Sequence, residues 1–464
     1  MSLSLSGPSF RILRSSGDHM DGISALGDLE RAQLDGALIR PNDLQYDRLR
    51  RVNNALIDRR PAAIVRAMTA SDVQKVVRVA RDHGTLLAVR CGGHSFPGLS
   101  TCDHGIVLDL SLMKAINVDP QARIAEVSGG ALLGDVDAAG LRHGLVTPAG
   151  VVSHTGVGGL TLGGGMGWLS RRFGLTIDNL LGVDIVTADG RLLRVNAEEE
   201  PDLFWAVRGG GGNFGVVTTF KFRLHPLGPI IAGHWAYPAS DASAILPRYR
   251  EALANVPREL TTMFILTPDR LRISALWSGS MNGAEAALSR FGKLGQSTPI
   301  AGEETSFLTL QQSFDEHAAP GRRYYSKGGF LQVIDDTAVL AISESMAEAP
   351  AVAEVYCLQL GGAVCDIEES TTAYSGRAAG HYWISQCVWD NPSDDDGAIS
   401  WARDTANRLA ALSLAANYVN EQSDTGIARR AYGEAKYDRL ARLKWQYDPT
   451  NLFRLNQNIE PRQQ

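Results

Sequence analysis

Residues 90–95, Arg-Cys-Gly-Gly-His-Ser, combine one imidazole with two glycines at the end of the apolar run 86–89. Glycine has no Cβ and tolerates positive φ, so Gly92 and Gly93 allow a large ligand to come close to the backbone. A neutral imidazole at such a place is a competent nucleophile. The motif therefore predicts binding or attachment of a ligand at His94, and a loop histidine bonded to backbone or water is the simpler alternative.

Two further glycine-rich segments lie in the same half of the chain, at residues 148–168 and 208–215. The last one fits the pattern G-x-G-x-x-G, but residues 202–208 have helical spacing and residues 216–220 have strand composition. A dinucleotide-binding turn needs the opposite order, with the strand before the glycines and the helix after them. The three loops instead indicate one large ligand that backbone surrounds from several sides.

In order, spacing and C-terminal tail, these segments resemble the covalent flavoproteins of the berberine bridge enzyme and 6-hydroxynicotine oxidase type, which have the vanillyl-alcohol-oxidase fold. The resemblance runs from Arg60 to the tail at residues 447–459, and through residues 150–190 it is nearest to bacterial polyketide-tailoring members such as the enterocin flavoenzyme. It implies an α+β fold, with a two-lobed FAD-binding domain of the PCMH type and a substrate domain built on an antiparallel sheet backed by helices.

The resemblance also implies that FAD is bonded through its 8α-methyl carbon to His94. Members with a second covalent link carry a cysteine that aligns with Val152, so we expect attachment through His94 only. The other residues expected to contact FAD are Arg90, Cys91, Gly92, Gly93, Ser95, Gly98, Pro148, Gly150, Val152, Thr155, Gly156, Gly158, Gly159, Gly163, Gly165, Gly167, Trp168, Asn179, Gly215, Val216, Val217, Tyr418, Asn420, Asn456 and Asn458.

The family's catalytic base has no direct counterpart in this chain. Plant members place a glutamate on a substrate-domain strand shortly before a tryptophan, and the matching residues 382–389 contain no carboxylate. On the strand-like run at residues 354–358, alternation places Glu354, Tyr356 and Leu358 on one face. Tyr356 is therefore one candidate for the base if this face meets the flavin, and a packed core tyrosine is the alternative.

Residues 418–421, Tyr-Val-Asn-Glu, provide the second candidate. They resemble the Tyr-x-Asn-Tyr segment whose last tyrosine is linked to catalysis in plant members, and Glu421 stands in its place. Partial burial would raise the pKa of this carboxyl into the range where it can abstract a hydroxyl or amine proton. Glu421 is thus a candidate base, with Tyr418 beside it in the motif, and a solvated surface glutamate is the alternative.

The sequence changes character after Pro226, where glycine clusters become rare and strand-like runs alternate with helical ones. This change predicts a separate domain that faces the substrate. The polar N-terminal residues have no sustained apolar run of the kind found in signal peptides. The expected division is a partly disordered lead-in at 1–34, an FAD-binding domain at 35–225 with lobes at 35–120 and 121–225, a substrate domain at 226–415, and a segment at 416–464 that returns to the FAD-binding domain.

With 464 residues, 21% of them charged, and a net charge of −6, the composition is that of an ordinary soluble globular protein. No basic stripe favours a nucleic-acid partner, and Arg171-Arg172 is interpreted as a solvated helix face or an anion contact. The five cysteines show no C-x-x-C spacing, so we expect neither a metal site nor a disulfide framework. No run is apolar enough to span a membrane, and a cytoplasmic location is expected.

We therefore expect an FAD-dependent oxidase that removes a hydride from an alcohol, an amine or an activated C–H of a small molecule, with a polyketide intermediate of secondary metabolism as substrate and molecular oxygen as acceptor. A dehydrogenase of the same fold with another acceptor and a non-catalytic flavin-binding protein are the alternatives. Plant members commonly carry Val or Leu where this chain has Thr155, a position thought to gate oxygen access, so the acceptor stays open. The sequence does not predict the oligomeric state.

Overall fold

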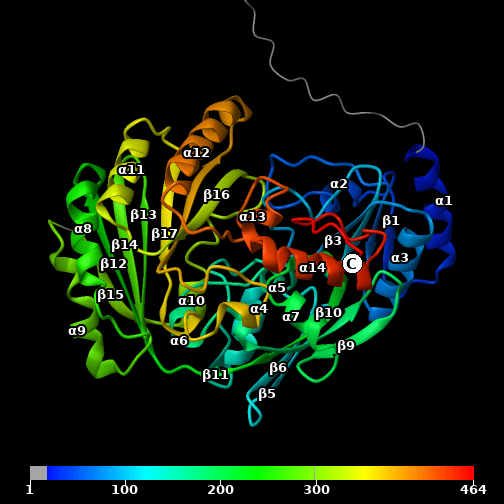
Figure 1. The fold of residues 1–464 in the computed structure, drawn as a ribbon, viewed down its shortest axis with the longest axis horizontal. Helices are drawn as coiled ribbons and strands as arrows, with labels where there is room; N and C mark the ends of the chain where they lie inside the picture. Colours follow the sequence, from blue (N-terminus) through cyan, green and yellow to red (C-terminus); the bar gives the residue numbers. More distant parts are fainter. Residues whose placement is uncertain (1–17, 297, 464) are drawn as a thin grey trace, which may run out of the picture.

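Three larger β-sheets carry the fold, and helices cover their outer faces (Figure 1). The structure is a computed structural model, which describes residues 18–296 and 298–463. The two smaller sheets lie on one side of the molecule and the largest sheet lies on the other. The α+β architecture predicted from the sequence is confirmed.

The first small sheet contains the strand that leads into the His94 loop. The spatial order of its strands is β1 (Ala37–Ile39), β2 (Ala63–Arg66), β4 (Ile106–Asp109) and β3 (Leu87–Arg90). The helix α3 (Ala70–Asp82) connects β2 to β3. The strand β4 pairs in parallel with β2 and with β3, and all four of its residues are buried. The helix buries Val73, Val76, Val77 and Ala80, which share one face because of the helical repeat.

A helix that the sequence analysis did not predict precedes this sheet. This helix, α1 (Asp18–Arg31), packs on α3. Ala25 and Leu29 are four residues apart, so they lie on the same face of α1, and both are buried in the core around the first sheet. The structure thus corrects the prediction of a partly disordered lead-in for residues 18–31, and residues 1–17 lie outside the described residues.

The second small sheet is antiparallel throughout and carries the other two glycine-rich segments. The spatial order of its strands is β5 (Ile116–Asp119), β6 (Ile124–Ser128), β10 (Val216–Arg223), β8 (Leu180–Val186) and β9 (Leu192–Asn196). The helices that pack with this sheet are α4 (Leu133–Leu141), α5 (Val157–Leu162) and α7 (Pro201–Val207). Because β5 pairs with β6, this sheet begins before the predicted lobe boundary at residue 120. The glycines between α7 and β10 follow a helix and precede a strand, as the sequence predicted.

The largest sheet has seven strands, all antiparallel. The spatial order of the strands is β15 (Thr298–Thr305), β12 (Ile230–Pro238), β14 (Arg270–Trp277), β13 (Leu260–Leu266), β17 (Ala353–Gln359), β18 (His381–Trp389) and β16 (Arg323–Leu331). The helices associated with this sheet are α8 (Ala242–Ala252), α9 (Ala284–Leu288), α11 (Asp336–Ala347) and α12 (Asp395–Ala410). These helices cover the outer face, where Phe264 and Cys357 are buried (Figure 1). Ile265, Leu358 and Ile384 belong instead to a cluster on the inner face, which meets the FAD-binding part.

The C-terminal segment returns to the smaller sheets through α13 (Ala428–Tyr432) and α14 (Glu434–Tyr447). Lys444 is fully buried, and its Nζ donates hydrogen bonds to the Asn213 carbonyl at 2.7 Å, to Asp448 Oδ2 at 2.7 Å and to the Phe453 carbonyl at 3.0 Å. Burial lowers the pKa of the Lys444 ammonium to about 8. This one side chain ties the last helix to the third glycine loop and to the tail.

The arginine pair on the short helix α6 (Ser170–Phe173) does not form a solvated face. Arg171 is only 6% exposed, and its Nε donates to the Leu260 carbonyl at 2.7 Å while Nη1 donates to the Leu360 carbonyl. Arg172 also donates to a carbonyl of the large-sheet domain. The interpretation as a solvated face or anion contact is therefore corrected, because both guanidinium groups join the two domains through backbone carbonyls.

Within residues 18–296 and 298–463, no helix combines the length and the apolar character that a membrane crossing requires. All five cysteines in that part of the chain are free, and no group of three or more His, Cys, Asp or Glu side chains there is arranged to hold a metal ion. Cys357 and Cys387 are buried in the core of the large sheet, where a thiol packs as a small apolar side chain.

Candidate active site

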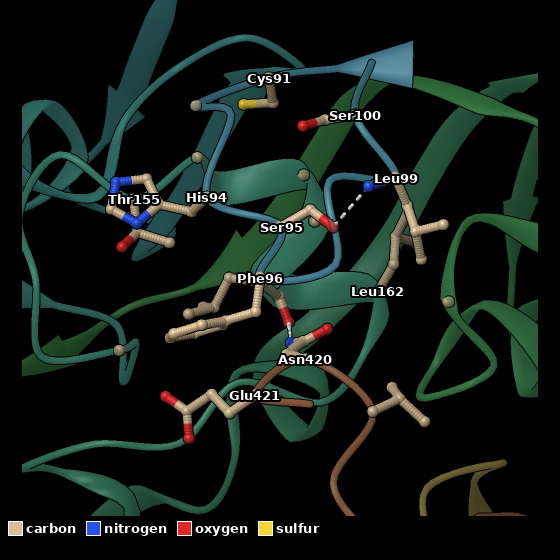
Figure 2. Close-up of a pocket in the computed structure, with 18 of the residues that line it drawn as sticks. Cys91, His94, Ser95, Phe96, Leu99, Ser100, Thr155, Leu162, Asn420 and Glu421 are labelled. Carbon is tan, nitrogen blue, oxygen red and sulfur yellow. Dashed lines mark hydrogen bonds between the residues drawn. The ribbon is translucent and has the colours of Figure 1, made fainter. Parts of the chain in front are cut away.

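A large cavity lies where the smaller sheets, the inner face of the large sheet and the C-terminal segment meet. Its volume is about 340 Å³, within the range of small-molecule sites. Figure 2 shows His94 and Ser95 on the loop that follows β3, and Asn420 and Glu421 on the C-terminal segment. The predicted site residues that line this cavity are Cys91, Gly92, Gly93, His94, Ser95, Gly150, Val152, Thr155, Gly156, Gly158, Gly159, Gly215, Val216, Val217, Tyr356, Tyr418, Asn420, Glu421 and Asn456.

The first two glycine loops touch each other backbone to backbone. A Cβ on Gly92 would lie 2.4 Å from the backbone nitrogen of Gly156, and a Cβ on Gly156 would lie 2.3 Å from the backbone nitrogen of Gly92. Gly159 also lines the cavity, yet no atom beyond its own helix and chain neighbours lies within 4 Å of the place where its Cβ would be. Glycine is therefore required for close packing at the first two positions, and at Gly159 it leaves open space for a ligand.

His94 is presented to the cavity as a neutral imidazole. Burial, followed by the neighbouring His154, lowers the pKa of His94 to about 3. Its Nε2 lies 2.7 Å from Nδ1 of His154, and the two ring centroids are 4.7 Å apart. The loop is held in shape by Ser95, whose Oγ accepts the N–H of Leu99 at 3.0 Å (Figure 2). A neutral ring keeps one nitrogen lone pair, so His94 has the protonation state that a nucleophile needs.

The residues present fit FAD. No lysine or arginine is among the described residues that line the cavity, so its walls offer an anionic pyrophosphate backbone donors rather than side-chain cations. The helix α5 begins after Gly156 without a side-chain cap. The N–H of Val157 donates to the Ala131 carbonyl at 3.0 Å, so the N–H groups that the first turn can offer to a ligand are those that follow it. Together with the open space at Gly159 and the neutral His94, these groups can hold a nucleotide and attach its ring.

Six of the residues expected to contact FAD do not line the cavity and pack behind it instead. They are Gly98, Pro148, Gly163, Gly165, Gly167 and Trp168. A Cβ on Gly163 would lie 2.1 Å from Oδ1 of Asn420, and one on Gly165 would lie 2.1 Å from Oγ1 of Thr176. These glycines therefore allow side chains from other segments to approach the loop, a reason for glycine that the sequence alone does not distinguish from ligand contact.

Three polar residues expected at the cofactor also lie outside the cavity lining, namely Arg90, Asn179 and Asn458. Arg90 is buried, and its Nη2 donates to Oδ2 of the buried Asp109 at 2.7 Å. Asn179 donates to two nearby carbonyls, and its Oδ1 lies 2.5 Å from Nε2 of His225. Arg90 and Asn179 are therefore held in hydrogen-bond networks of the protein itself, and cofactor contact by these three residues stays a prediction.

Glu421 is a half-buried carboxyl at the cavity wall. Burial raises the pKa of Glu421 to about 7, and the neighbouring Tyr382 hydroxyl partly opposes that rise. No Lys or Arg among the described residues forms an ion pair with it. Its segment is fixed by Asp424, whose Oδ2 accepts Nζ of Lys327 at 2.8 Å. The carboxyl is thus not a solvated surface group, and its pKa lies where a general base works best near neutral pH.

The two tyrosine candidates have different surroundings. Burial and then the charge of Glu421 raise the pKa of Tyr356 well above its ordinary value, so this hydroxyl stays protonated and can donate a hydrogen bond. The hydroxyl of Tyr418 accepts the N–H of Gly165 at 3.1 Å and Nδ2 of Asn420 at 2.9 Å. Of the three predicted catalytic residues, Glu421 is therefore the one whose surroundings suit a base.

A second carboxylate in the cavity was not given a role by sequence reasoning. Glu354 is 6% exposed, and its Oε1 accepts Nε2 of Gln386 at 2.6 Å and lies 3.0 Å from Nε2 of His317. All three side chains line the cavity. The bond to Glu354 raises the pKa of His317. Alternation along β17 had placed Glu354 on the same face as Tyr356, and this was the available signal; His317 lies in a loop without a motif.

Most of the remaining lining is aromatic, apolar or amide. Lining residues that the sequence analysis did not assign to the site include Asn53, Asn54, Phe96, Leu99, Ile265, Phe314, Tyr324, Leu358, Tyr382 and Ile384. Phe96 follows the His94 motif by two residues, which was a usable signal, whereas most of the others face the cavity only because of how the sheets pack. Such a wall excludes water from the reacting groups and strengthens electrostatic interactions within the site.

Comparisons with known proteins agree with this geometry. The family described as FAD binding domain matches residues 61–196, and the family described as Berberine and berberine like matches residues 417–460. An FAD-linked oxidoreductase of Dictyostelium discoideum is 32% identical over 407 residues, covering 86% of this chain and 89% of that protein. (R)-6-hydroxynicotine oxidase of Paenarthrobacter nicotinovorans is 30% identical over 457 residues, covering 92% and 97%. The crystal structure of 6-hydroxy-D-nicotine oxidase from Arthrobacter nicotinovorans superposes with a TM-score of 0.84 at 27% identity, covering 93% of this chain and 99% of that one.

The fold and the cavity thus define a two-domain oxidoreductase with a PCMH-type FAD-binding domain. The chain belongs to the berberine-bridge-enzyme-like family of FAD-linked oxidoreductases. Both matched families coincide with segments that line the cavity, since the first contains the His94 loop and the second contains Asn420 and Glu421.

Proposed function

We propose that this enzyme is an oxidase that carries FAD attached through His94 alone, and that it removes a hydride from an alcohol, an amine or an activated C–H of a small molecule. The observation that carries the proposal is that two groups with shifted pKa values line one cavity. The imidazole of His94, which is neutral, lies at the glycine loops, and the carboxyl of Glu421, whose pKa is about 7, lies on the C-terminal segment.

When bound, FAD would supply a two-electron acceptor for the hydride. Glu421 would accept the proton of the substrate's hydroxyl or amine, which favours departure of the hydride from the adjacent carbon. The protonated hydroxyl of Tyr356 would donate a hydrogen bond that orients the substrate, since β17 places this residue on the cavity wall. Glu354, held by Gln386 and His317, would fix another polar group of the substrate.

The lining supports a substrate with an apolar or aromatic body and without a strongly anionic group. Two carboxylates line the cavity, and no lysine or arginine is found among its described lining residues. A phosphate or carboxylate on the substrate would therefore meet no opposite charge. We propose a polyketide intermediate of secondary metabolism, on the basis of the resemblance through residues 150–190, and this choice agrees with such a wall.

Molecular oxygen is the acceptor we propose, and a dehydrogenase with another acceptor is the second candidate. Thr155 is the reason for keeping the second candidate, because it lines the cavity at the position, thought to gate oxygen access, where plant members commonly carry Val or Leu. The two are separated by reducing the protein with dithionite without air and then admitting air. An oxidase regains its yellow colour within seconds, whereas colour that stays bleached for many minutes would refute oxygen as the acceptor.

Attachment is tested by denaturing and precipitating the purified protein. Yellow colour should remain with the pellet of the wild-type protein, and His94→Ala should release it into the supernatant. A histidyl peptide should be the only flavin peptide found by mass spectrometry, since Val152 offers no thiol. Val152→Cys is the matched gain-of-function variant, because its thiol would line the same cavity. Flavin still bound covalently in His94→Ala would overturn the assignment.

A further inference from the structure

His154 lies next to the flavin-loop glycines in the sequence, where it could face the flavin ring or serve a structural role, and the structure places it against the attachment residue. Nδ1 of His154 lies 2.7 Å from Nε2 of His94, and the planes of the two rings are inclined by 39°. His154 precedes Thr155 and Gly156, on the glycine segment that packs backbone to backbone against the His94 loop. The contact therefore joins two of the three glycine loops through their side chains as well.

The large-sheet domain holds His154 in this position. Nε2 of His154 lies 3.3 Å from the backbone carbonyl of Asp315, a residue between α10 (Phe307–Gln311) and β16. The carboxylate of Asp315 accepts the backbone N–H of Ser153 at 2.8 Å and the hydroxyl of Ser153 at 2.5 Å. Asp315 thus fixes both Ser153 and His154 across the boundary between the two domains.

These contacts decide which ring nitrogens carry protons. A carbonyl oxygen can only accept, so Nε2 of His154 must be the protonated nitrogen of that ring. In the neutral ring Nδ1 then holds a lone pair and accepts the proton of Nε2 of His94. His94 is consequently protonated at Nε2, and its Nδ1 carries the free lone pair.

We propose that His154, held by Asp315, is a positioning residue for flavin attachment, which fixes the His94 tautomer with Nδ1 as the nucleophile and accepts the Nε2 proton as the bond forms. The proposal rests on the proposed attachment of FAD at His94. It assigns control of that attachment in part to Asp315, a residue of the large-sheet domain.

The step balances within the protein and its cofactor. A bond forms between Nδ1 of His94 and the 8α carbon, and one C–H bond of that methyl group breaks. His154 takes the Nε2 proton of His94, so the substituted ring ends neutral rather than as an imidazolium. The electron pair of the broken C–H bond would pass to the flavin. Dioxygen, the acceptor of the proposed function, would take up that pair with two protons, the one released from the methyl group and the one held by His154, and leave as hydrogen peroxide. The Asp315 carbonyl stabilises the charge that His154 carries for that moment.

The test compares three variants with the wild-type full-length chain. His154→Leu removes the acceptor and keeps an apolar side chain of similar size. His154→Asn restores an acceptor, because its side-chain oxygen lies near the place of Nδ1. The exposed His143→Leu is the matched control for loss of a histidine elsewhere on the FAD-binding domain. Two quantities are measured for each: the FAD content of the native protein from its visible spectrum, and the covalently loaded fraction from the intact mass after denaturation, followed over time after added FAD.

We expect all variants to bind FAD in the native state, while His154→Leu attaches it at least tenfold more slowly than the wild type. His154→Asn should recover attachment to within a few-fold, and His143→Leu should behave like the wild type. Attachment in His154→Leu at the wild-type rate would overturn the proposal, and so would a His154→Asn variant as slow as His154→Leu, since shape alone would then explain the effect. A wild-type protein without covalent flavin would instead refute the proposed attachment at His94, so the two failures are distinguishable.

Discussion

Replacing Glu421 by glutamine removes the proposed base and keeps the shape of the side chain. General base catalysis contributes roughly 10²- to 10⁴-fold to a rate, so Glu421→Gln should slow flavin reduction by about that factor. This corresponds to about 3–5 kcal/mol of activation free energy. Flavin attachment at His94 should be unaffected, because Glu421 enters the cavity from another segment of the chain (Figure 2).

The pH dependence gives this prediction its sign. Only the ionised carboxyl can accept a proton, and the pKa of Glu421 is about 7. Flavin reduction in the wild type should therefore rise with pH, reach half of its maximum near pH 7, and fall about tenfold for each unit below pH 6. The Tyr382 hydroxyl lowers the pKa of Glu421, so Tyr382→Phe should move the midpoint to higher pH.

The assay is stopped-flow bleaching of the flavin by substrate without air, measured from pH 5 to 9. Glu434→Gln is a matched control, because Glu434 lies in the same C-terminal segment with a side chain that is 74% exposed. The pH profile of Glu421→Gln should be flat in the range where the wild type changes. A variant that bleaches at the wild-type rate, or that keeps the wild-type midpoint near pH 7, would refute Glu421 as the base.

Three further predictions concern residues around the site. Tyr356→Phe should reduce the rate of flavin bleaching by only about tenfold and leave the pH midpoint of that rate in place. The reason is that a hydroxyl that stays protonated orients the substrate without accepting a proton, and a shifted midpoint would contradict this. Lys444→Met should lower the free energy of unfolding, measured in urea, by about 3–5 kcal/mol, because Asp448 is left as a buried charge without its partner. Gly165→Ala should lower the melting temperature of the protein, because the new Cβ would lie 2.1 Å from Oγ1 of Thr176 and the backbone φ of residue 165 is +75°. Gly228→Ala is the control and should melt like the wild type, because a Cβ at that position has no neighbouring atom within 4 Å.

The sequence predicts the fold well where local pattern and motif agree. The helical spacing of Val73, Val76 and Val77 predicts a helix close to the observed α3, and the reversed order of elements around Gly210 is enough to exclude a dinucleotide-binding turn. The helix α1 was missed because the largely polar composition of residues 18–31 resembles that of a disordered segment. Its buried residues Ala25 and Leu29 give only a weak apolar stripe.

Residues paired across the domains could not be predicted in this way. Arg171 was interpreted as solvated, yet its partners are the carbonyls of Leu260 and Leu360, which are distant in sequence. Glu354 lies directly opposite Gln386 in the pairing of β17 with β18, and a strand register between distant segments is not readable from either segment alone. The motif around His94 was recognisable because its glycines and imidazole are adjacent in the chain, whereas Glu354, Gln386 and His317 meet only after the large sheet has formed.

The two carboxylates of the cavity show how environment divides one residue type between two tasks. Oε1 of Glu354 accepts a hydrogen bond from Gln386 and contacts His317, so this carboxylate is held in place as an acceptor for neighbouring N–H groups. Glu421 is half-buried with only the Tyr382 hydroxyl to lower its pKa, and the carboxyl therefore gains and loses a proton near neutral pH. A group that exchanges protons at working pH suits a base, and a carboxylate tied by two donors suits recognition. This difference in partners, more than position in any motif, is the reason why we propose Glu421 as the base and Glu354 as a binding partner for a polar group of the substrate.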